Sequence, residues 1–269
     1  MTLAGVLARP TVDLIRPTVA CPLRRQRHDP CAGTWLAPGD LAFAPMKNNF
    51  AAEQPVRLLK ALPPAPGEAP ANCRRCDLWK RATQAVNGEG SRHATIMMVG
   101  EQPGDEEDHR GRPFVGPAGR LLDEAIEEAG LTRGSVYITN AVKHFKWEPR
   151  GKRRLHKKPG LREINACNVW LEQEITEIAP ETIVALGGTA LRALTGVTLT
   201  IAVARGAELR HGQGARLIAS YHPSAILRAE GEHARLLRKS LIADLRLADR
   251  IAGESARAHA RSGSAPSIQ

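Results

Sequence analysis

The stretch WEPRGKRRLHKKPG, residues 147–160, places a single histidine, His156, in a dense run of cations. Residues 143–158 contain eight lysines and arginines but one acidic residue, Glu148, and the whole chain has a net charge of +10. Clustered cations of this kind attract phosphate groups, so a polyanion is the natural partner. A solvated charge run that only keeps the protein soluble is the alternative. It gives no reason for an imidazole, and the pattern therefore favours a phosphate-binding loop that takes part in chemistry.

The five cysteines include one C-x-x-C pair, Cys73 and Cys76. An odd count with one tight pair is not typical of a secreted disulfide framework; it indicates a metal or redox role and a reducing, cytoplasmic compartment. Cys167 falls on the apolar stripe of a predicted helix, where it is either a third ligand or a small buried core residue. Cys21 and Cys31 receive no assignment.

The elements that must position these residues alternate along the chain. Short apolar runs predict strands at residues 94–100, 136–142, 182–188 and 215–224, the last running into a loop. Helical patterns cover residues 117–130 and 161–179, follow residue 188, and begin again near Glu232. The alternation predicts an α/β fold with three α/β/α layers and a central, mostly parallel sheet.

Three segments that leave predicted strand ends carry polar residues: GEQPG (100–104), TNAVKHF (139–145) and HPS (222–224). In open α/β sheets, ligands bind beyond the carboxyl ends of the strands. We therefore expect these segments to converge on one site.

The ends of the chain look different from its middle. Residues 1–50 show no sustained periodicity and are predicted to form a disordered extension of unknown role, while residues 51–254 form the folded domain and residues 255–269 a disordered tail. No apolar run approaches the ~20 residues that span a bilayer, so we expect no membrane partner. A monomer is expected.

Several motifs resemble one known family. GEQPGDEEDHRGRPFVGPAGRLLD, TNAVKHFKW, GKRRLH and HPS occur in order over residues 70–250. They resemble the uracil-DNA glycosylase superfamily and, within it, the UdgX type, an iron–sulfur branch related to family 4. The resemblance implies the glycosylase fold and uracil-containing DNA, preferably single-stranded, as the partner.

The resemblance also implies roles for five residues around an extruded uracil. Phe114 would stack on the base, Asn140 would pair with N3–H and O4, and His222 would hydrogen-bond O2 of the departing base. Gln102 would offer its amide or backbone N–H, and Glu101 would stabilise positive charge on the sugar. Cytosine reverses the polarity of the edge that Asn140 reads, so it would be rejected. From the residues alone, Glu101 could be a cap or turn acid, Asn140 a turn residue and His222 a loop residue. For Phe114 the residues alone favour a core position, and the resemblance reverses that order.

The resemblance further implies an iron–sulfur cluster. Family-4 enzymes carry a cysteine after the lysine of TNxVK, whereas this chain has His144, a departure shared by UdgX-like proteins. We therefore predict Cys73, Cys76, His144 and Cys167 as the ligands of a [4Fe–4S] cluster. Three thiolates and an imidazole also suit Zn²⁺, which residue chemistry alone slightly favours.

In UdgX-like proteins the histidine of a KRRIH loop attacks C1′ of the sugar, and KRRLH here ends at His156. The resemblance implies uracil excision followed by irreversible covalent capture of DNA, with Glu101 and His222 as the other catalytic residues. The surrounding cations are expected to lower the pKa of His156. Phosphates would be held by Lys152, Arg153, Arg154, Lys157 and Lys158. The alternatives are a conventional glycosylase with turnover and a non-catalytic, metal-containing DNA-binding protein.

Overall fold

The computed structural model describes residues 63–262, with side chains described for residues 63–254. The predicted extension over residues 1–50 lies outside this part of the chain. Six strands form the main sheet in the order β1-β3-β2-β6-β8-β7. Their bounds are Glu89–Gly90 (β1), Ile96–Gly100 (β2), Tyr137–Asn140 (β3), Thr182–Leu186 (β6), Leu209–Arg210 (β7) and Arg216–Ser220 (β8). The four central strands run parallel, and the two short edge strands are antiparallel to their neighbours.

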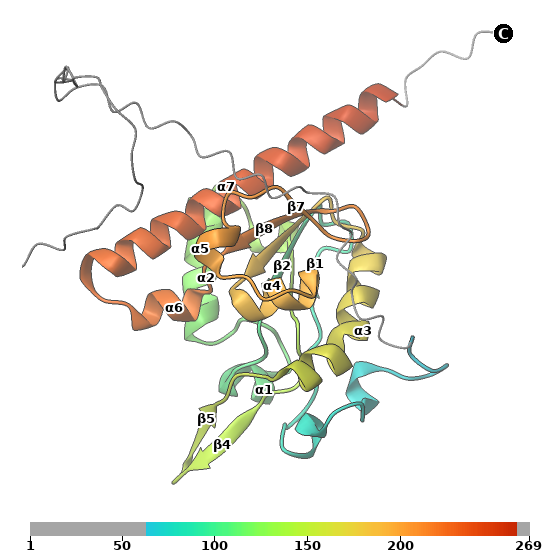
Figure 1. The fold of residues 1–269 in the computed structure, drawn as a ribbon, viewed down its shortest axis with the longest axis vertical. Coiled ribbons are helices and arrows are strands. Elements are labelled where there is room, and N and C mark those ends of the chain that lie inside the picture. The colour runs from blue at the N-terminus through green and yellow to red at the C-terminus, as the bar shows by residue number, and fades with distance from the viewer. Residues whose placement is uncertain (1–62, 263–269) are drawn as a thin grey trace, which may run out of the picture. The chain divides into compact units, whose positions relative to one another are not determined.

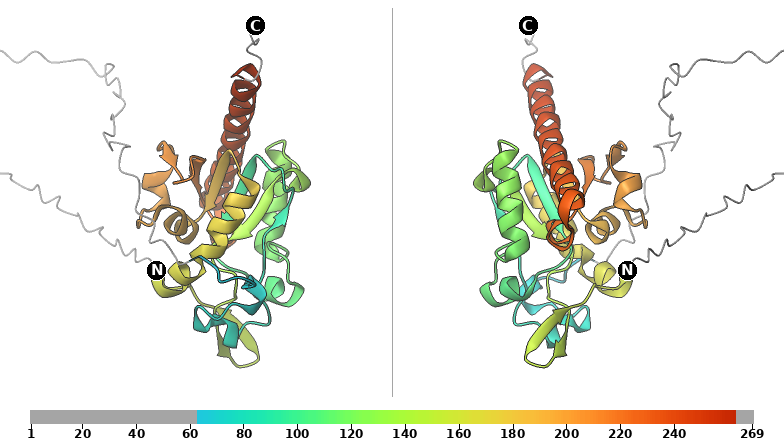
Figure 2. Two further views of the ribbon diagram at one scale, coloured as in Figure 1. Left: turned by 90° about the vertical axis from the view of Figure 1, so that its right-hand side faces the viewer. Right: turned by 90° about the vertical axis from the view of Figure 1, so that its left-hand side faces the viewer.

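Helices cover both faces of this sheet (Figures 1 and 2). The α-helices are Asp105–Arg110 (α1), Pro117–Glu128 (α2), Leu161–Ile178 (α3), Gly188–Thr195 (α4), Ile201–Ala204 (α5), Pro223–Arg228 (α6) and Gly231–Ser262 (α7). Three 3-10 helices are Pro70–Asn72 (η1), Asp77–Lys80 (η2) and Arg133–Ser135 (η3). The predicted three-layer α/β/α architecture is confirmed.

The core explains why the central strands read as continuous apolar runs. In β2, Met97 and Val99 pack with α3 and α4, whereas Ile96 and Met98 pack with α2 and α7. Side chains alternate between the faces of a strand, so a strand covered on both faces needs apolar residues at every position. This arrangement leaves the strand ends as the place for polar chemistry.

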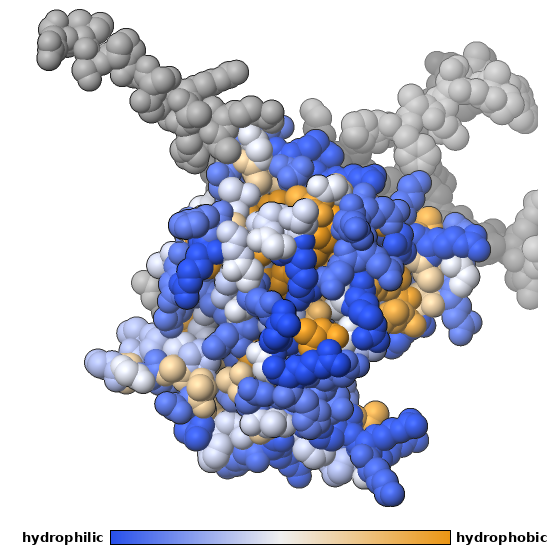
Figure 3. Space-filling view, turned by 180° about the vertical axis from the view of Figure 1, so that it is seen from behind, coloured by the Kyte–Doolittle hydropathy of each residue, from blue (hydrophilic) through white to orange (hydrophobic). Residues whose placement is uncertain are grey.

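The basic stretch predicted as a loop is a two-stranded hairpin. β4 (Trp147–Arg150) pairs antiparallel with β5 (Arg153–His156), with Arg150 opposite Arg153 and Trp147 opposite His156. Gly151 adopts a φ of 59°, which suits the tight two-residue turn. In Figure 1 the hairpin projects from the sheet end that carries α1, and Figure 3 shows its surface as mostly hydrophilic.

The C-terminal helix α7 continues to Ser262, so its backbone is helical beyond the predicted boundary at Glu254. Leu237, Leu241 and Leu245 pack its apolar face against the sheet. Across the described residues, no helix is long and apolar enough to cross a membrane.

Candidate active site

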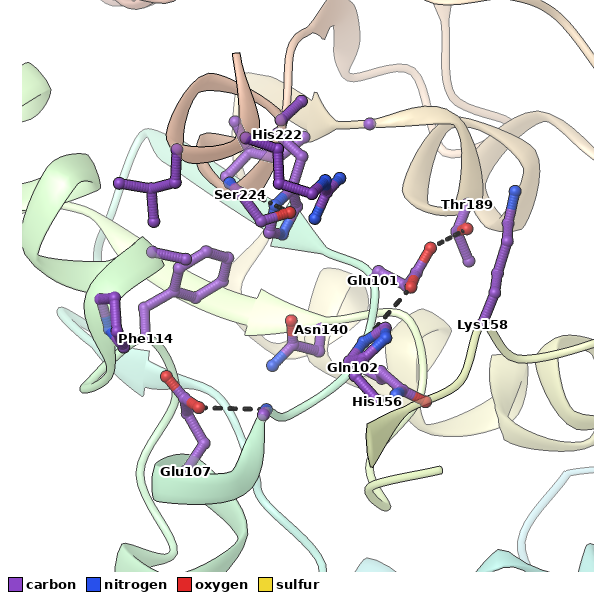
Figure 4. A pocket seen from close by; sticks show the side chains of 18 of the residues that line it. Glu101, Gln102, Glu107, Phe114, Asn140, His156, Lys158, Thr189, His222 and Ser224 are labelled. Carbon is purple, nitrogen blue, oxygen red and sulfur yellow. Dashed lines mark hydrogen bonds and ion pairs between the residues drawn. The ribbon is translucent and has the colours of Figure 1, made fainter. Parts of the chain in front are cut away.

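A cavity of about 880 Å³ lies at the carboxyl ends of the parallel strands. Seven residues that the sequence singled out line it together, namely Glu101, Gln102, Phe114, Asn140, His156, Lys158 and His222 (Figure 4). They come from the segments after β2, β3 and β8, from the loop before α2, and from the end of the β4–β5 hairpin. The expected convergence of strand-end segments therefore occurs, and it includes the basic hairpin.

Glu101 lines this cavity and lies between two partners. Its Oε1 is 3.5 Å from Nε2 of His156, and its Oε2 accepts a hydrogen bond from the hydroxyl of Thr189. Thr189 comes from the start of α4 and was not predicted; the only sequence signal was its place after the β6 strand end. Thr189 thus fixes one oxygen of the carboxylate, and the other oxygen faces the imidazole of His156.

Burial is the main cause that lowers the pKa of His156, and the positive charge of Arg228 adds to it, while Glu101 opposes both. The cations of the hairpin itself were expected to lower this pKa. The cation that acts is instead Arg228, at the end of α6, which also lines the cavity. A neutral imidazole with a free lone pair is the form that can act as a nucleophile or base.

His222 has a defined tautomer. Its Nδ1 accepts hydrogen bonds from the backbone N–H of Ser224 at 3.1 Å and lies 2.8 Å from the Ser224 hydroxyl, which makes the residue the N-cap of α6. Burial, then the charges of Arg228 and His156, lower its pKa to about 4. The neutral ring therefore carries its proton on Nε2, where it can donate to a ligand.

The position of the Phe114 ring depends on an unusual backbone conformation at this residue. Its φ is 54°, in the left-handed region that non-glycine residues seldom adopt. Gly119 permits this packing, because a Cβ there would lie 1.8 Å from the carbonyl oxygen of Phe114. The ring centroid is 5.8 Å from that of His222, so the two rings border the same part of the cavity.

Asn140 also lines the cavity. Its side chain is 2% exposed, and its Oδ1 is buried with no hydrogen-bond partner among the described residues. Gly100 leaves room for it, since a Cβ at that position would lie 2.4 Å from Oδ1 and 2.5 Å from Cζ of Phe114. Buried polar atoms without partners are rare, and this one points to a ligand that donates a hydrogen bond.

Gln102 is placed differently from the expectation that its amide faces the base. Its Nε2 donates to the carbonyl oxygens of Lys146 and Lys157, both at 3.2 Å, and its Oε1 accepts from the backbone N–H of Lys146. The side chain therefore fastens the base of the hairpin to the GEQPG loop. The sequence prediction gave Gln102 two groups that could bind the base, its side-chain amide and its backbone N–H. The amide makes these hydrogen bonds within the protein, so the backbone N–H is the group that remains.

The predicted phosphate contacts separate into two groups. Arg154, 17% exposed, binds Asp105, the fully buried Asp108 and His109 of α1, and so holds the hairpin to the protein. Lys157 pairs with Glu148 at 2.8 Å. Among the described residues, Lys152, Arg153 and Lys158 are exposed and have no carboxylate partner. Arg154 and Lys157 are thus paired with carboxylates, whereas these three exposed cations are not.

Glu107 is a second acid of the cavity that the sequence analysis missed. It is buried, and its carboxylate accepts from the backbone N–H groups of Gly104 at 3.0 Å and Gly116 at 2.7 Å. It therefore ties the GEQPG loop to the loop that carries Phe114. Its only sequence signal is an acid in the first turn of a helix, which has an ordinary capping explanation.

Of the predicted metal ligands, Cys73, His144 and Cys167 are buried and Cys76 is partly buried. Sγ of Cys73 accepts from the Trp170 indole N–H, and Sγ of Cys167 accepts from the Lys143 backbone N–H, both at 3.2 Å. Burial raises the pKa of Cys167 to about 12, and the nearby Cys76 and Cys73 add to that rise. The three thiols are thus neighbours.

The fourth predicted ligand, His144, is also buried. Burial lowers its pKa, and its charged neighbours are Asp108 and Arg74. No group of three or more described His, Cys, Asp or Glu side chains converges closely enough to hold one metal ion. Zinc needs four donors about 2.0–2.3 Å from one point. A four-iron cluster places each ligand on a different iron atom, so its four ligands need not converge on one point.

Comparison with known proteins agrees with this geometry. Residues 87–246 match the family model described as the uracil DNA glycosylase superfamily. A type-4 uracil-DNA glycosylase of Thermotoga maritima is 41% identical over 164 residues, which cover 61% of this chain and 82% of the relative. A type-4 enzyme of Archaeoglobus fulgidus is 39% identical, covering 58% and 78%, and a type-5 enzyme of Pyrobaculum aerophilum is 32% identical, covering 57% and 71%. This chain belongs to the uracil-DNA glycosylase superfamily.

Proposed function

We propose that this protein is a uracil-DNA glycosylase that removes uracil from DNA. The observation that carries the proposal is the buried Oδ1 of Asn140, which lacks a hydrogen-bond donor among the described residues. The N3–H of uracil is such a donor, and cytosine has an acceptor there. The type-4 relatives, named as uracil-DNA glycosylases, support the same substrate.

The surrounding side chains suit the charges that develop as the bond between C1′ and N1 breaks. Phe114 offers a ring on which the base can stack, which is worth ~1–3 kcal/mol and helps offset extrusion. His222, with its proton on Nε2, donates to the base as negative charge builds there. Glu101 supplies the anion that stabilises positive charge on the sugar.

A [4Fe–4S] cluster bound by Cys73, Cys76, His144 and Cys167 belongs to this proposal. Bound there, it would act as a structural cross-link. Cys73 directly follows η1, Cys76 directly precedes η2, and Cys167 lies on α3. These ligands would therefore join the N-terminal described segment to the helix that follows the hairpin.

Conventional turnover is the first form of the proposal, because the relatives are named simply as glycosylases. Covalent capture of the sugar by His156 is the second, and one specific observation favours it. His156 Nε2 lies in the cavity 3.5 Å from Glu101, on a ring whose pKa is lowered. In this form the neutral ring carries its proton on Nδ1, so the lone pair of Nε2 bonds to C1′ as the bond from C1′ to N1 breaks. The electron pair of that bond leaves with the uracil, and the Nδ1 proton of the resulting imidazolium is released to solvent.

A non-catalytic DNA-binding protein is disfavoured by the same cavity. It would have no use for the acid, the imidazole donor, the aromatic ring and the amide that line one pocket. Single-stranded DNA is the proposed preferred form, with Lys152, Arg153 and Lys158 as phosphate contacts.

One experiment tests these forms together. The protein is incubated with oligonucleotides that carry one uracil or one thymine, single- or double-stranded. Free uracil is quantified, and a detergent gel is run after boiling. Release of uracil in excess of protein supports turnover; a uracil-dependent, boiling-resistant band that His156→Ala abolishes supports capture. Neither uracil release nor a band would refute glycosylase function.

A further inference from the structure

A buried ion pair lies next to the backbone of Asn140, and neither of its residues lines the cavity. Nζ of Lys143 is 2.6 Å from Oε2 of Glu174, and the two side chains are 1% and 12% exposed. Lys143 lies three residues after Asn140 and Glu174 lies on α3. Burying two charges is costly unless each is fully hydrogen-bonded, so a pair in this position needs an explanation.

The pair is bonded to the strand that carries Asn140. Besides Glu174, Lys143 Nζ contacts the Thr139 hydroxyl oxygen at 2.7 Å and donates to the Asn140 carbonyl oxygen at 2.9 Å. The Thr139 hydroxyl donates to Glu174 Oε2 at 2.7 Å. The three side chains therefore form a closed hydrogen-bonded triangle, and its cation also holds the backbone of Asn140.

Two further contacts connect this triangle to the rest of the protein. Glu174 Oε1 accepts from the backbone N–H of Gly88, just before the edge strand β1. The Lys143 backbone N–H donates to Sγ of Cys167 on α3. The end of β3 is thus tied at two points to α3 and at one to the segment before β1.

On the cavity side, Asn140 has no such support. Its Oδ1 is unpartnered, and its position depends on the backbone from which it projects. That backbone continues into Ala141 and Val142, whose N–H groups donate to the carbonyl oxygens of Gly100 and Glu101. In Figure 4, Asn140 points into the space bordered by Phe114 and Gln102.

We propose that Lys143, Glu174 and Thr139 form a brace that positions Asn140 for base recognition. The inference rests on the proposed function for its substrate. None of the three residues lines the cavity, so they are positioning residues. A shift of about 1 Å at a reacting site can reduce a rate by about a hundredfold, which is why a rigid support matters here.

The test uses the full chain and Thr139→Val, which removes the bridging hydroxyl and keeps the shape of the side chain. Thr182→Val is the matched control, because Thr182 is also fully buried in a strand but its hydroxyl has no partner among the described residues. The double variant Lys143→Met with Glu174→Gln removes both charges together, so that no buried charge is left unpaired.

Single-turnover excision of uracil is measured against enzyme concentration, with active-site titration and thermal unfolding. We expect Thr139→Val to lower the maximal rate at least about tenfold, with the half-saturating concentration within twofold of wild type, because the phosphate contacts are untouched. The double variant should behave alike, and Thr182→Val should match wild type. A Thr139→Val protein that is less stable but keeps the wild-type rate per active molecule would overturn the brace.

A second readout does not depend on uracil chemistry. Hydrogen exchange at the Ala141 and Val142 amides should be at least about tenfold faster in Thr139→Val than in Thr182→Val. Equal exchange in the two variants would refute the brace. If the wild-type protein excised no uracil, the proposed function would fail, and exchange at these amides would still decide whether the brace exists.

Discussion

The Nε2 atom of His156 lies 3.5 Å from the Oε1 atom of Glu101, although one residue ends the β4–β5 hairpin and the other follows β2. Gln102 fastens the base of the hairpin to the loop of Glu101, and Arg154 fastens its strand to α1. The approach of the imidazole to the carboxylate is therefore produced by neighbours on both sides. Several consequences of this arrangement can be measured.

Replacing the Glu101 carboxylate should slow excision without unfolding the protein. Glu101→Gln keeps the size of the side chain and its contact with Thr189, but it removes the negative charge opposite the sugar. We expect the single-turnover rate to fall by about a hundredfold. Glu127→Gln, at an exposed position on α2, is the control and should leave the rate unchanged. Equal rates for the two variants would remove Glu101 from the chemistry.

Replacing two neighbouring arginines, Arg153 and Arg154, should affect different properties, one DNA binding and the other stability. Arg154→Ala leaves Asp108 buried without its cation, which should cost about 3 kcal/mol of unfolding free energy. Arg153→Ala removes an exposed cation and should change that free energy by less than about 0.5 kcal/mol. It should instead weaken DNA binding and lower the slope of the logarithm of the binding constant against the logarithm of salt concentration by about one. Urea unfolding measures the change in unfolding free energy, and binding titrations at several salt concentrations measure the change in DNA affinity. An Arg154→Ala protein as stable as wild type would show that Arg154 does not hold the hairpin to α1.

His222 should make stability depend on pH. Its pKa is about 4 in the folded protein, against 6.5 for an unperturbed histidine, because burial, Arg228 and His156 disfavour the charged ring. Below pH 6.5 the unfolded chain binds a proton that the folded protein refuses, so the free energy of unfolding falls as the pH drops from 6.5 towards 4. His222→Gln should flatten this part of the profile. An identical slope in both proteins would show that His222 is not held neutral.

Metal content should distinguish the cluster from zinc. Anaerobically purified protein should contain iron and acid-labile sulfide in equal amounts, with absorbance in the visible range. Cys76→Ala should lower both contents and destabilise the protein, because the link between the N-terminal described segment and α3 is weakened. Cys21→Ala is the matched control and should keep both. Zinc without sulfide would contradict the cluster.

The architecture and the meeting of the strand ends could be predicted because both follow from patterns that are local in sequence. Continuous apolar strands such as 94–100 require cover on both faces, and parallel strands bring their carboxyl ends together. Phe114, Asn140 and His222 were identified through the resemblance to a family, since each residue alone has an ordinary structural explanation.

The remaining features depend on contacts between distant segments. Nothing near Gln102 in the sequence indicates that its amide binds the carbonyls of Lys146 and Lys157, and a basic run gives no sign that Arg154 faces two acids of α1. Arg228 acts on His156 and His222 from the end of a short helix. These relationships arise from tertiary packing, which sequence periodicity does not encode.

Recognition of uracil by the side-chain amide of Asn140 underlies the proposed function, and the Asn140→Leu variant isolates that contact. Leucine fills a similar volume and removes the unpartnered Oδ1, so the free energy of unfolding should stay the same or rise. Excision of uracil from a single-uracil oligonucleotide should fall at least about a hundredfold. A stable Asn140→Leu protein that still released uracil at the wild-type rate would show that Asn140 does not recognise the base.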